Sequence, residues 1–417
     1  MQGLWSCLRI PAHKNHTSCP SKLFSQKTQR DQSPSEPEVQ SKEGHMSTHK
    51  QSSLMTTGLA LFSMFFGAGN LIFPLLVGQS VGENGWYAVL GLGLTAVVVP
   101  FLGLAAMLLF EGNTRRFFGK IGKVPGVALF FLLQLMIGPF GVIPRLVTLM
   151  HAMAKPYLSD LSLTSFSLLT GVVIFFACKN RQKLIGYLGI VFTPILLLSL
   201  AALIYLGISS GTQFNPTALG AQDSFFKGLI GGYQTMDLIA AFLFATVVMP
   251  HFRHRHETQE GVQIKKVFLS SAIAASLLLL SYIGLCFISV YHGWSLLASC
   301  PPEELLRAIA VQLLGPVGGF IAVIAVISAC LSTAMTLAAI FADYLRADIC
   351  KGRLSSNASL IITMAVTTVM ANLGFRGIAA VLGPILQVIY PGLILLTVLN
   401  LLHLFYKKRK EQELLWM

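Results

Sequence analysis

Long apolar runs separated by short polar loops make up the chain from residue 54 onward. One helix needs about 20 apolar residues to cross the hydrocarbon core of a bilayer. The last run is too short for two spans with a turn between them, so it predicts one tilted helix with a kink at Pro391. Windows of the required length predict ten membrane-spanning helices, over residues 54–77, 86–110, 124–150, 162–178, 184–208, 226–249, 267–291, 316–345, 355–372 and 377–405.

The composition agrees with this pattern. Of the 417 residues, 54% are hydrophobic and 11% are charged, whereas soluble domains carry about 25% charged residues. A water-soluble fold could not bury so much apolar surface, but lipid solvates it. We therefore predict an all-α polytopic membrane protein. The seven cysteines show no paired spacing, and several lie in apolar runs, which indicates small core residues rather than disulfides or metal ligands.

Residues 1–53 differ from the rest because they are polar and rich in Ser, Lys, Gln and His. They lack an apolar stretch long enough for a signal peptide. Their composition predicts a disordered N-terminal tail on the cytoplasmic side. Met46 precedes the first span closely, so translation that starts at Met46 is the alternative to a genuine tail.

The formal net charge of +13 is concentrated in alternate loops. Lys and Arg gather in cytoplasmic loops of membrane proteins, so this asymmetry predicts an inner-membrane, multi-pass protein with both termini in the cytoplasm. The charge is thereby explained without a nucleic-acid partner. The opposite loops hold four basic residues, Lys155, Lys227, Arg307 and Arg376, and the predicted cytoplasmic side holds 18: Arg115, Arg116, Lys120, Lys123, Lys179, Arg181, Lys183, Arg253, Arg255, Lys265, Lys266, Arg346, Lys351, Arg353, Lys407, Lys408, Arg409 and Lys410.

Ten spans with both ends on one side divide into two sets of five that enter the membrane from opposite sides. This predicts a 5+5 inverted repeat, the arrangement common in secondary transporters. Residues 54–208 form the first repeat and 226–405 the second. The segment 209–225 is then an extracytoplasmic loop, and 406–417 a cytoplasmic tail.

The first predicted span contains Gly67-Ala68-Gly69-Asn70 and then Pro74, which are poor choices for a continuous helix. A break in lipid persists only if protein, ion or ligand satisfies the freed backbone groups. The half-helix that begins after the break suits a carboxylate, and the carbonyls that end the preceding half suit a cation. The alternative is a Gly-rich packing face between helices.

The sixth span is the corresponding position of the second half. It begins with Gly231-Gly232 and carries Tyr233, Thr235, Met236 and Asp237 at membrane depth. Asp237 is the only acidic residue well inside a predicted span, and such a carboxylate indicates function. Asp237 has two possible roles: it contacts an ion or the substrate directly, or it caps the end of a broken helix.

The eighth span contains adjacent hydroxyls at Ser332 and Thr333. Hydroxyl oxygens are hard ligands of the kind that sodium prefers. The alternative is ordinary bonding of each hydroxyl to the carbonyl four residues back.

Five ordered motifs resemble one family, the branched-chain amino acid:cation symporters. They cover essentially all of residues 54–405 and are FFGAGNLIFP (65–74), IGPFGVIPR (137–145), GYQTMDLIA (232–240), ACLSTA (329–334) and NLGF followed by PILQVIYP (372–391). The resemblance implies uptake of leucine, isoleucine and valine driven by a sodium gradient. It implies no cofactor besides sodium as the coupling ion.

The family is similar in turn to the leucine-transporter fold, whose first and sixth helices are broken. That similarity implies that the amides around Ala68 and Gly69 bind the substrate carboxylate. We predict that Asn70, Tyr233, Thr235, Met236 and Asp237 complete the substrate site. The implied sodium ligands are the carbonyls of Ser63, Phe66 and Ala329 and the hydroxyls of Ser332 and Thr333.

Two features depart from the family pattern. Members often continue the third-span motif as Pro-Arg-Thr, whereas Arg145 is followed by Leu146 here. Typical members also have two further spans after the tenth. Because the five-plus-five core is present, we expect transport to survive, with a changed oligomer contact.

The predicted mechanism is alternating access, with one set of helices rocking against the other around the site. Phe62, Phe65, Tyr233, Met236 and Phe242 are candidates for the side-chain pocket. An enzyme is not expected, because no HExxH or nucleophile–base pair lies in the spans, and His251, His254 and His256 fall in a basic loop. A channel is not expected either, because the sequence shows neither a selectivity-filter motif nor charged rings. The nearest rival is a proton-coupled permease for other neutral amino acids, with Asp237 carrying the proton.

Overall fold

The computed structural model describes residues 54–158, 161–178, 191–211, 219–253, 260–293 and 300–415. The predicted N-terminal tail, with Cys7 and Cys19, lies outside the described residues. So do residues 212–218 of the predicted loop 209–225, the residues His254, Arg255 and His256, and the basic residues Lys179, Arg181 and Lys183.

The described secondary structure is entirely helical, without a strand among these residues. Two breaks that the sequence predicts are visible between α2 and α3 and between α12 and α13. The helices are α2 (Leu54–Phe65), α3 (Ala68–Val81), α4 (Gly85–Gly93), α5 (Val99–Leu109), α6 (Thr114–Phe118), α7 (Lys123–Ile137), α8 (Val142–Ala154), α9 (Leu163–Cys178), α11 (Thr193–Ser209), α12 (Ala221–Gln234), α13 (Asp237–Arg253), α14 (Glu260–His292), α15 (Leu305–Tyr344), α16 (Ser356–Ala371) and α17 (Gly374–Leu415).

Six helical stretches among the described residues are long and apolar enough to cross a membrane, judged by length and composition. Four shorter apolar helices, α2, α9, α11 and α16, accompany them. The predicted total of ten spans and the inverted symmetry stay predictions. The six stretches are Ala68–Leu109, Lys123–Tyr157, Ala221–Thr246, Lys266–His292, Pro302–Ile349 and Gly374–Tyr406.

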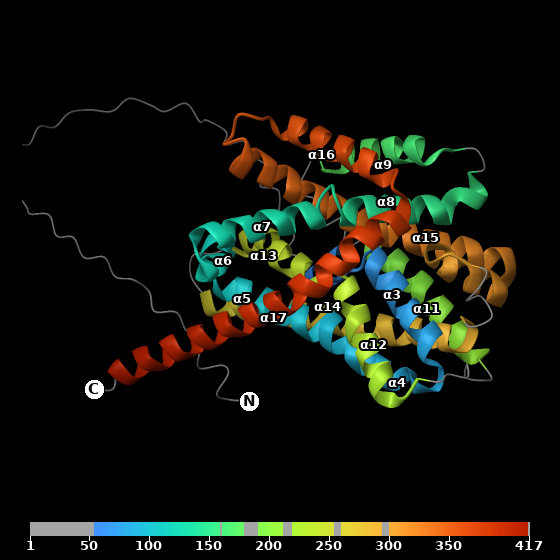
Figure 1. Ribbon diagram of the computed structural model, residues 1–417, viewed down its shortest axis with the longest axis horizontal. Helices are drawn as coiled ribbons and strands as arrows, with labels where there is room; N and C mark the ends of the chain where they lie inside the picture. Colours follow the sequence, from blue (N-terminus) through green and yellow to red (C-terminus); the bar gives the residue numbers. More distant parts are fainter. Residues whose placement is uncertain are drawn as a thin grey trace, which may run out of the picture.

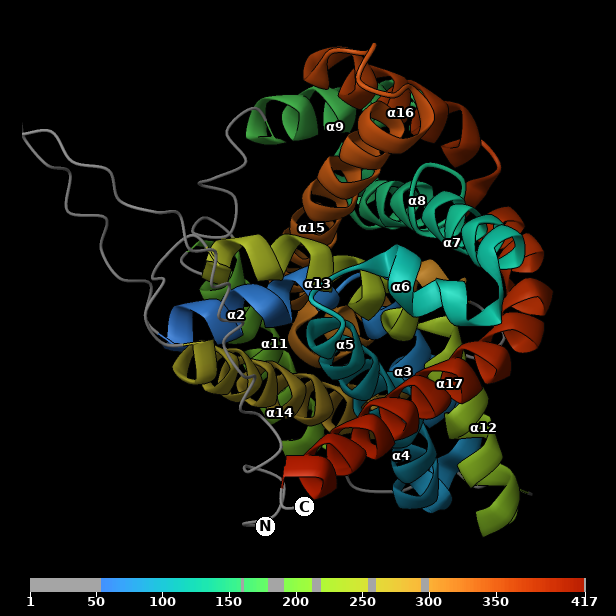
Figure 2. The same ribbon diagram turned by 90° about the vertical axis from the view of Figure 1, so that its left-hand side faces the viewer.

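The helices form two packed groups (Figures 1 and 2). In one group α8, α9, α15 and α16 contact one another, with α9 and α16 side by side at one edge. In the other, α14 packs on α2 and α3, α4 packs on α12, and α5 packs on α13. Helix α17 crosses the outside and contacts α5, α8, α12 and α16. Helix α11 packs on α14 and on α15, so the groups meet where α15 contacts α2, α3 and α11.

The breaks fall near their predicted positions but not at the same residues. The first lies at Phe66 and Gly67, so Ala68, Gly69 and Asn70 form the first turn of α3 instead of the break itself. Within α15, Gly315 has a φ of 64° and precedes Pro316, which is where the eighth span was predicted to begin. Helix α17 passes through Pro384 and Pro391 without ending.

The predicted third span over 124–150 lies within the stretch Lys123–Tyr157, which is long and apolar enough to cross a membrane, but its helix is interrupted. Helix α7 ends at Ile137, α8 begins at Val142, and residues 138–141 form turns. A side chain at Gly138 would lie 2.6 Å from the ring of Phe341 on α15, so the chain approaches that helix closely here. Pro139 between the two glycines lacks a backbone N–H and disfavours a continuous helix.

Candidate functional site

The break in the first predicted span and the break in the sixth, which occupies the corresponding position of the second half, lie in contact. A side chain on Gly69 would lie 2.9 Å from the Cα of Thr235, in the turn between α12 and α13. Met236 in the same turn has a φ of 65°, an uncommon backbone conformation for a residue with a side chain. Ala68, Thr235, Met236 and Asp237 are all buried. The unwound backbone of one helix therefore meets the first turn of the other inside the protein.

A hydrogen-bonded network joins the two breaks. Asn70 Oδ1 accepts from the backbone N–H of Gly67 at 3.2 Å, and Asn70 Nδ2 donates to Asp237 Oδ2 at 2.7 Å and to the hydroxyl of Tyr282. Tyr282, on α14, donates to the same Asp237 oxygen at 2.8 Å. A buried carboxylate is costly without such donors. Asp237 therefore has neutral hydrogen-bonding partners from two other helices.

The start of α13 is held by a second tyrosine. The hydroxyl of Tyr390, on α17, accepts from the backbone N–H of Leu238 at 3.0 Å. The ring of Tyr390 lies 5.0 Å from that of Tyr233, measured between centroids. One of the orphan N–H groups at this helix start is thereby satisfied from outside the helix.

The five predicted sodium ligands lie together where α2 ends against α15. Ser332 Oγ lies 2.9 Å from the carbonyl oxygens of both Ser63 and Ala329. Thr333 Oγ1 lies 3.3 Å from the carbonyl oxygen of Ser63 and 3.2 Å from that of Phe66. All five residues are buried. The geometry therefore brings this predicted set together, three carbonyls and two hydroxyls.

Arg145, on α8, is a functional candidate that the sequence reasoning did not include. It is 2% exposed, and Nη1 faces the sulfur of Met236 at 3.8 Å. Its guanidinium carbon lies 5.2 Å from the ring centroids of both Phe73 on α3 and Phe375 on α17. Nε and Nη2 have no hydrogen-bond partner in the described structure. A basic residue inside a predicted span was the available signal.

Tyr282 and Tyr390 were also missed, and the sequence offers no signal for them because each is a lone tyrosine in an apolar run.

Two of the pocket candidates have packing partners elsewhere. Phe65 packs on Phe101 and Phe244, with ring centroids 5.2 and 4.9 Å away. Phe242 packs on Phe117 and Phe118, with centroids 5.1 and 5.5 Å away. Phe62 is stacked on Phe66 at 5.0 Å.

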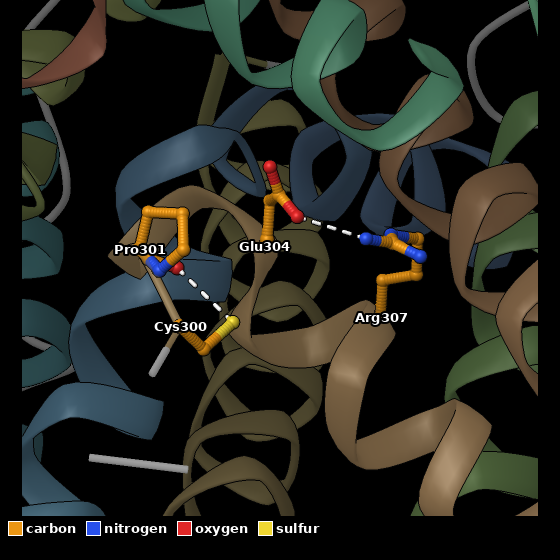
Figure 3. Close-up of polar contacts among 4 residues, drawn as sticks. All are labelled: Cys300, Pro301, Glu304 and Arg307. Carbon is orange, nitrogen blue, oxygen red and sulfur yellow. Dashed lines mark hydrogen bonds and ion pairs between the residues drawn. The ribbon is translucent and has the colours of Figure 1, made fainter. Parts of the chain in front are cut away.

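A half-buried ion pair marks the start of α15 (Figure 3). Arg307 Nη2 lies 2.8 Å from Glu304 Oε2, with side chains 22% and 30% exposed. The short helix η7 (Pro302–Glu304) just before it contacts α3 and α8, two elements of the site. Cys300 beside it donates through Sγ to the carbonyl of Pro301 at 3.5 Å.

Solved structures with a similar arrangement are secondary transporters of the leucine-transporter fold. The inward-facing conformation of Mhp1 gives a TM-score of 0.55 at 16% identity, covering 84% of this chain and 73% of that one. The substrate-bound, outward-open state of a Na⁺-coupled sialic acid symporter gives 0.53 at 12% identity, covering 83% and 78%. At these identities the likeness shows the fold.

The family follows from the sequence comparisons. Residues 50–417 match the family described as branched-chain amino acid transport protein, and the chain belongs to that family. It is 31% identical over 366 residues to the branched-chain amino acid permease BraB of Bacillus subtilis (strain 168), covering 85% of this chain and 81% of that protein. It is 30% identical over 368 residues to the permease BrnQ of the same organism, covering 86% and 83%. The chain is thus a transport protein and not an enzyme.

Proposed function

We propose that the chain imports leucine, isoleucine and valine together with sodium by alternating access. Family membership and the names of the relatives support the substrate class. The buried oxygen cluster at Ser332 and Thr333 supports the ion. The meeting of two helix breaks between two packed groups of helices supports the mechanism.

The oxygen cluster carries the proposal. Each hydroxyl has one hydrogen, yet the two hydroxyls make four close contacts with three carbonyl oxygens. Two of these contacts therefore place oxygen lone pairs against each other, which a cation would turn into attraction. Ligands at right angles around a hard cation such as Ca²⁺ lie about 3.3–3.7 Å apart. The observed separations of 2.9–3.3 Å need only a small expansion to accept an ion.

The substrate is placed beside this cluster, at the two breaks. The first-turn amides of Ala68 and Gly69 have no intrahelical acceptor and stand at the positive end of α3, which suits the substrate carboxylate. Asp237, with Asn70 beside it, suits the ammonium group. Tyr233, Thr235 and Met236 supply the rest of the contact from the end of α12 and the turn after it.

Proton coupling is the second candidate, and one observation favours it. Asp237 is 2% exposed, and the hydrogen bonds described for its side chain come from neutral groups of Asn70, Tyr282 and Thr235. A carboxylate in such surroundings can exchange a proton as the site opens and closes. In that case the oxygen cluster would be structural.

Uptake of radiolabelled leucine into proteoliposomes separates the two candidates. With sodium coupling, uptake requires an inward sodium gradient and drops at least about tenfold in Ser332→Ala and Thr333→Ala, which remove an ion ligand. Thr333→Ser keeps the hydroxyl and is expected to retain most of the activity. Thr367→Ala on α16 is the matched control, because its buried hydroxyl bonds only the carbonyl of Thr363 in the described structure.

The contrary result is equally clear. Uptake that ignores sodium, follows an inward proton gradient and is abolished in Asp237→Asn would replace sodium by the proton as the coupling ion. Absence of any leucine-dependent flux in the wild type would reject the substrate assignment itself.

A further inference from the structure

Arg145 is a buried cation with a free hydrogen-bonding edge. It is 2% exposed, and none of the described carboxylates forms an ion pair with it. Placing a charge in a low-dielectric interior is costly unless it is paired. The two phenylalanine rings recover part of this cost through their faces. They cannot satisfy the N–H groups, which lie in the plane of the guanidinium.

The particular atoms left free define a shape. Nη1 faces Met236, whereas Nε and Nη2 have no partner in the described structure. In a guanidinium, the N–H of Nε and one N–H of Nη2 point the same way and form a planar fork. That fork matches the two oxygens of a carboxylate.

The location connects this fork to the substrate site. Phe73 follows Gly69 by four residues, so it lies one turn further along the same face of α3. Helical side chains lean toward the N-terminus, which brings the Phe73 ring, and with it Arg145, toward the first turn of α3. Met236 belongs to the other break. Arg145 therefore contacts residues of both broken helices.

We propose that Arg145 is a substrate-binding residue whose Nε/Nη2 fork holds the carboxylate of the transported amino acid. This inference rests on the proposed function and adds a second set of donors to the amides of Ala68 and Gly69. Together with Asp237, it gives the site one buried positive and one buried negative group, which matches a zwitterion. Ligands that lack the carboxylate would leave the guanidinium unpaired and bind weakly.

The test compares two ligands that differ in one group. Binding of L-leucine and of L-leucinol, which replaces the carboxylate by a hydroxymethyl group, is measured by titration calorimetry on the purified full chain with saturating sodium. In the wild type we expect leucine to bind at least about 30-fold more tightly, the loss typical of an unpaired buried charge. In Arg145→Gln we expect leucine affinity to fall to the level of leucinol, whose own affinity changes little.

Arg145→Lys keeps the charge and the aliphatic stem but has no fork. It is expected to show an intermediate preference for leucine, and it tests the proposal even if the neutral variant does not fold. Arg307→Gln is the matched control, since Arg307 is half-buried and already paired with Glu304. Its preference for leucine over leucinol should equal that of the wild type.

Two outcomes would overturn the role of Arg145. One is an unchanged ratio of the two affinities in both Arg145 variants, whatever happens to the affinities themselves. The other is recovery of leucine binding when Arg145→Gln is combined with Asp237→Asn, because Arg145 would then only balance the charge of Asp237. A wild type that binds neither ligand would instead reject the proposed function on which the inference depends.

Discussion

At the scale of single residues, Asn70 links the two broken helices through one side chain. Its oxygen accepts from Gly67, and its nitrogen donates to Asp237 and to Tyr282. Because Tyr282 also donates to Asp237, the three side chains form a closed set. Removal of one member leaves the others with unsatisfied polar groups in a buried place, where water cannot replace the lost partner.

The Tyr282→Phe variant tests this set by deleting one hydroxyl and keeping the ring. We expect it to lower the stability of the folded protein by about 1–3 kcal/mol, because the Asp237 carboxylate loses a donor while it stays buried. The measurement is the temperature at which half of the purified protein is lost from the monodisperse peak in size-exclusion chromatography. Tyr205→Phe is the control, since Tyr205 is 74% exposed. Equal behaviour of the two variants would contradict a closed set.

Sequence reasoning identified the members of this set whose residue type is rare inside membrane spans. Asp237 was a predicted site residue for that reason, whereas Asn70 was predicted as part of the break in the first span. Tyr282 is buried as deeply, but a tyrosine among apolar residues is common and gave no reason to select it. Arg145 carried the same kind of signal as Asp237. Its contacts with Met236, Phe73 and Phe375 join segments far apart in the sequence, which the motif around it does not show.

At the scale of elements, the site depends on backbone that leaves the helix at two places. Broken helices are tolerated at membrane depth only where neighbours satisfy the freed groups. Here the side-chain oxygen of Asn70 accepts a hydrogen bond from the N–H of Gly67 at the first break. The hydroxyl of Tyr390 accepts one from the N–H of Leu238 after the second break. The breaks are also close enough that only a glycine fits at position 69.

Gly69→Ala is therefore expected to separate the two breaks. The added carbon would lie 2.9 Å from backbone atoms of Thr235, which cannot rotate away as a flexible side chain could. We expect leucine uptake in proteoliposomes to fall at least about tenfold, the effect of a shift near 1 Å in a binding geometry.

The control for this change is Gly392→Ala in α17. An added carbon there meets nothing within 4 Å, and alanine suits a helix interior better than glycine by about 0.5–1 kcal/mol. Uptake by this variant should equal that of the wild type. Full uptake by Gly69→Ala would show that the close approach of the breaks is not needed for transport.

The breaks show how far local sequence signals reach. Those of the first and sixth spans were predictable because glycine, polar residues and proline cluster within otherwise apolar runs. The third-span break at Gly138–Gly141 carries a similar signal, Gly-Pro-Phe-Gly, within the predicted span 124–150. The close approach of Phe341 on α15 to Gly138 adds a contact between distant segments, which local propensity does not encode.

At the scale of the whole molecule, three contacts join segments that the charge pattern assigns to the same side of the membrane. Arg115, before the third span, pairs with Asp348, after the eighth, at 2.8 Å. Asn400 donates to the carbonyl of Phe117 at 3.2 Å, which brings the last part of α17 to the same end. Thr164 donates to Asn372 at 2.7 Å and joins two loops of the sparsely charged end. Each contact joins segments that lie in, or close to, loops predicted to be on the same side.

Which end faces the cytoplasm is a prediction that labelling in whole cells can test. In a background whose native cysteines are replaced, single cysteines are placed at Lys120 and Arg409 on the basic end, and at Lys155 and Arg376 on the other. Basic loops resist translocation across the membrane. We therefore expect a membrane-impermeant maleimide to label positions 155 and 376 in intact cells, and 120 and 409 only after permeabilisation.

The four positions also test the predicted inverted repeat, because each repeat contributes one position on each side. Lys120 and Lys155 lie in the first repeat, Arg376 lies in the second, and Arg409 lies in the tail directly after the second. Labelling of one basic-end position in intact cells, but not the other, would mean that one half crosses the membrane an unexpected number of times. That result would remove the correspondence between the two breaks, and with it the reason for placing ion and substrate where they meet. If labelling were reversed at all four positions, the basic end would face the outside of the cell. The site would be preserved, but the protein would lie in the membrane in the orientation opposite to the one that the positive-inside rule predicts.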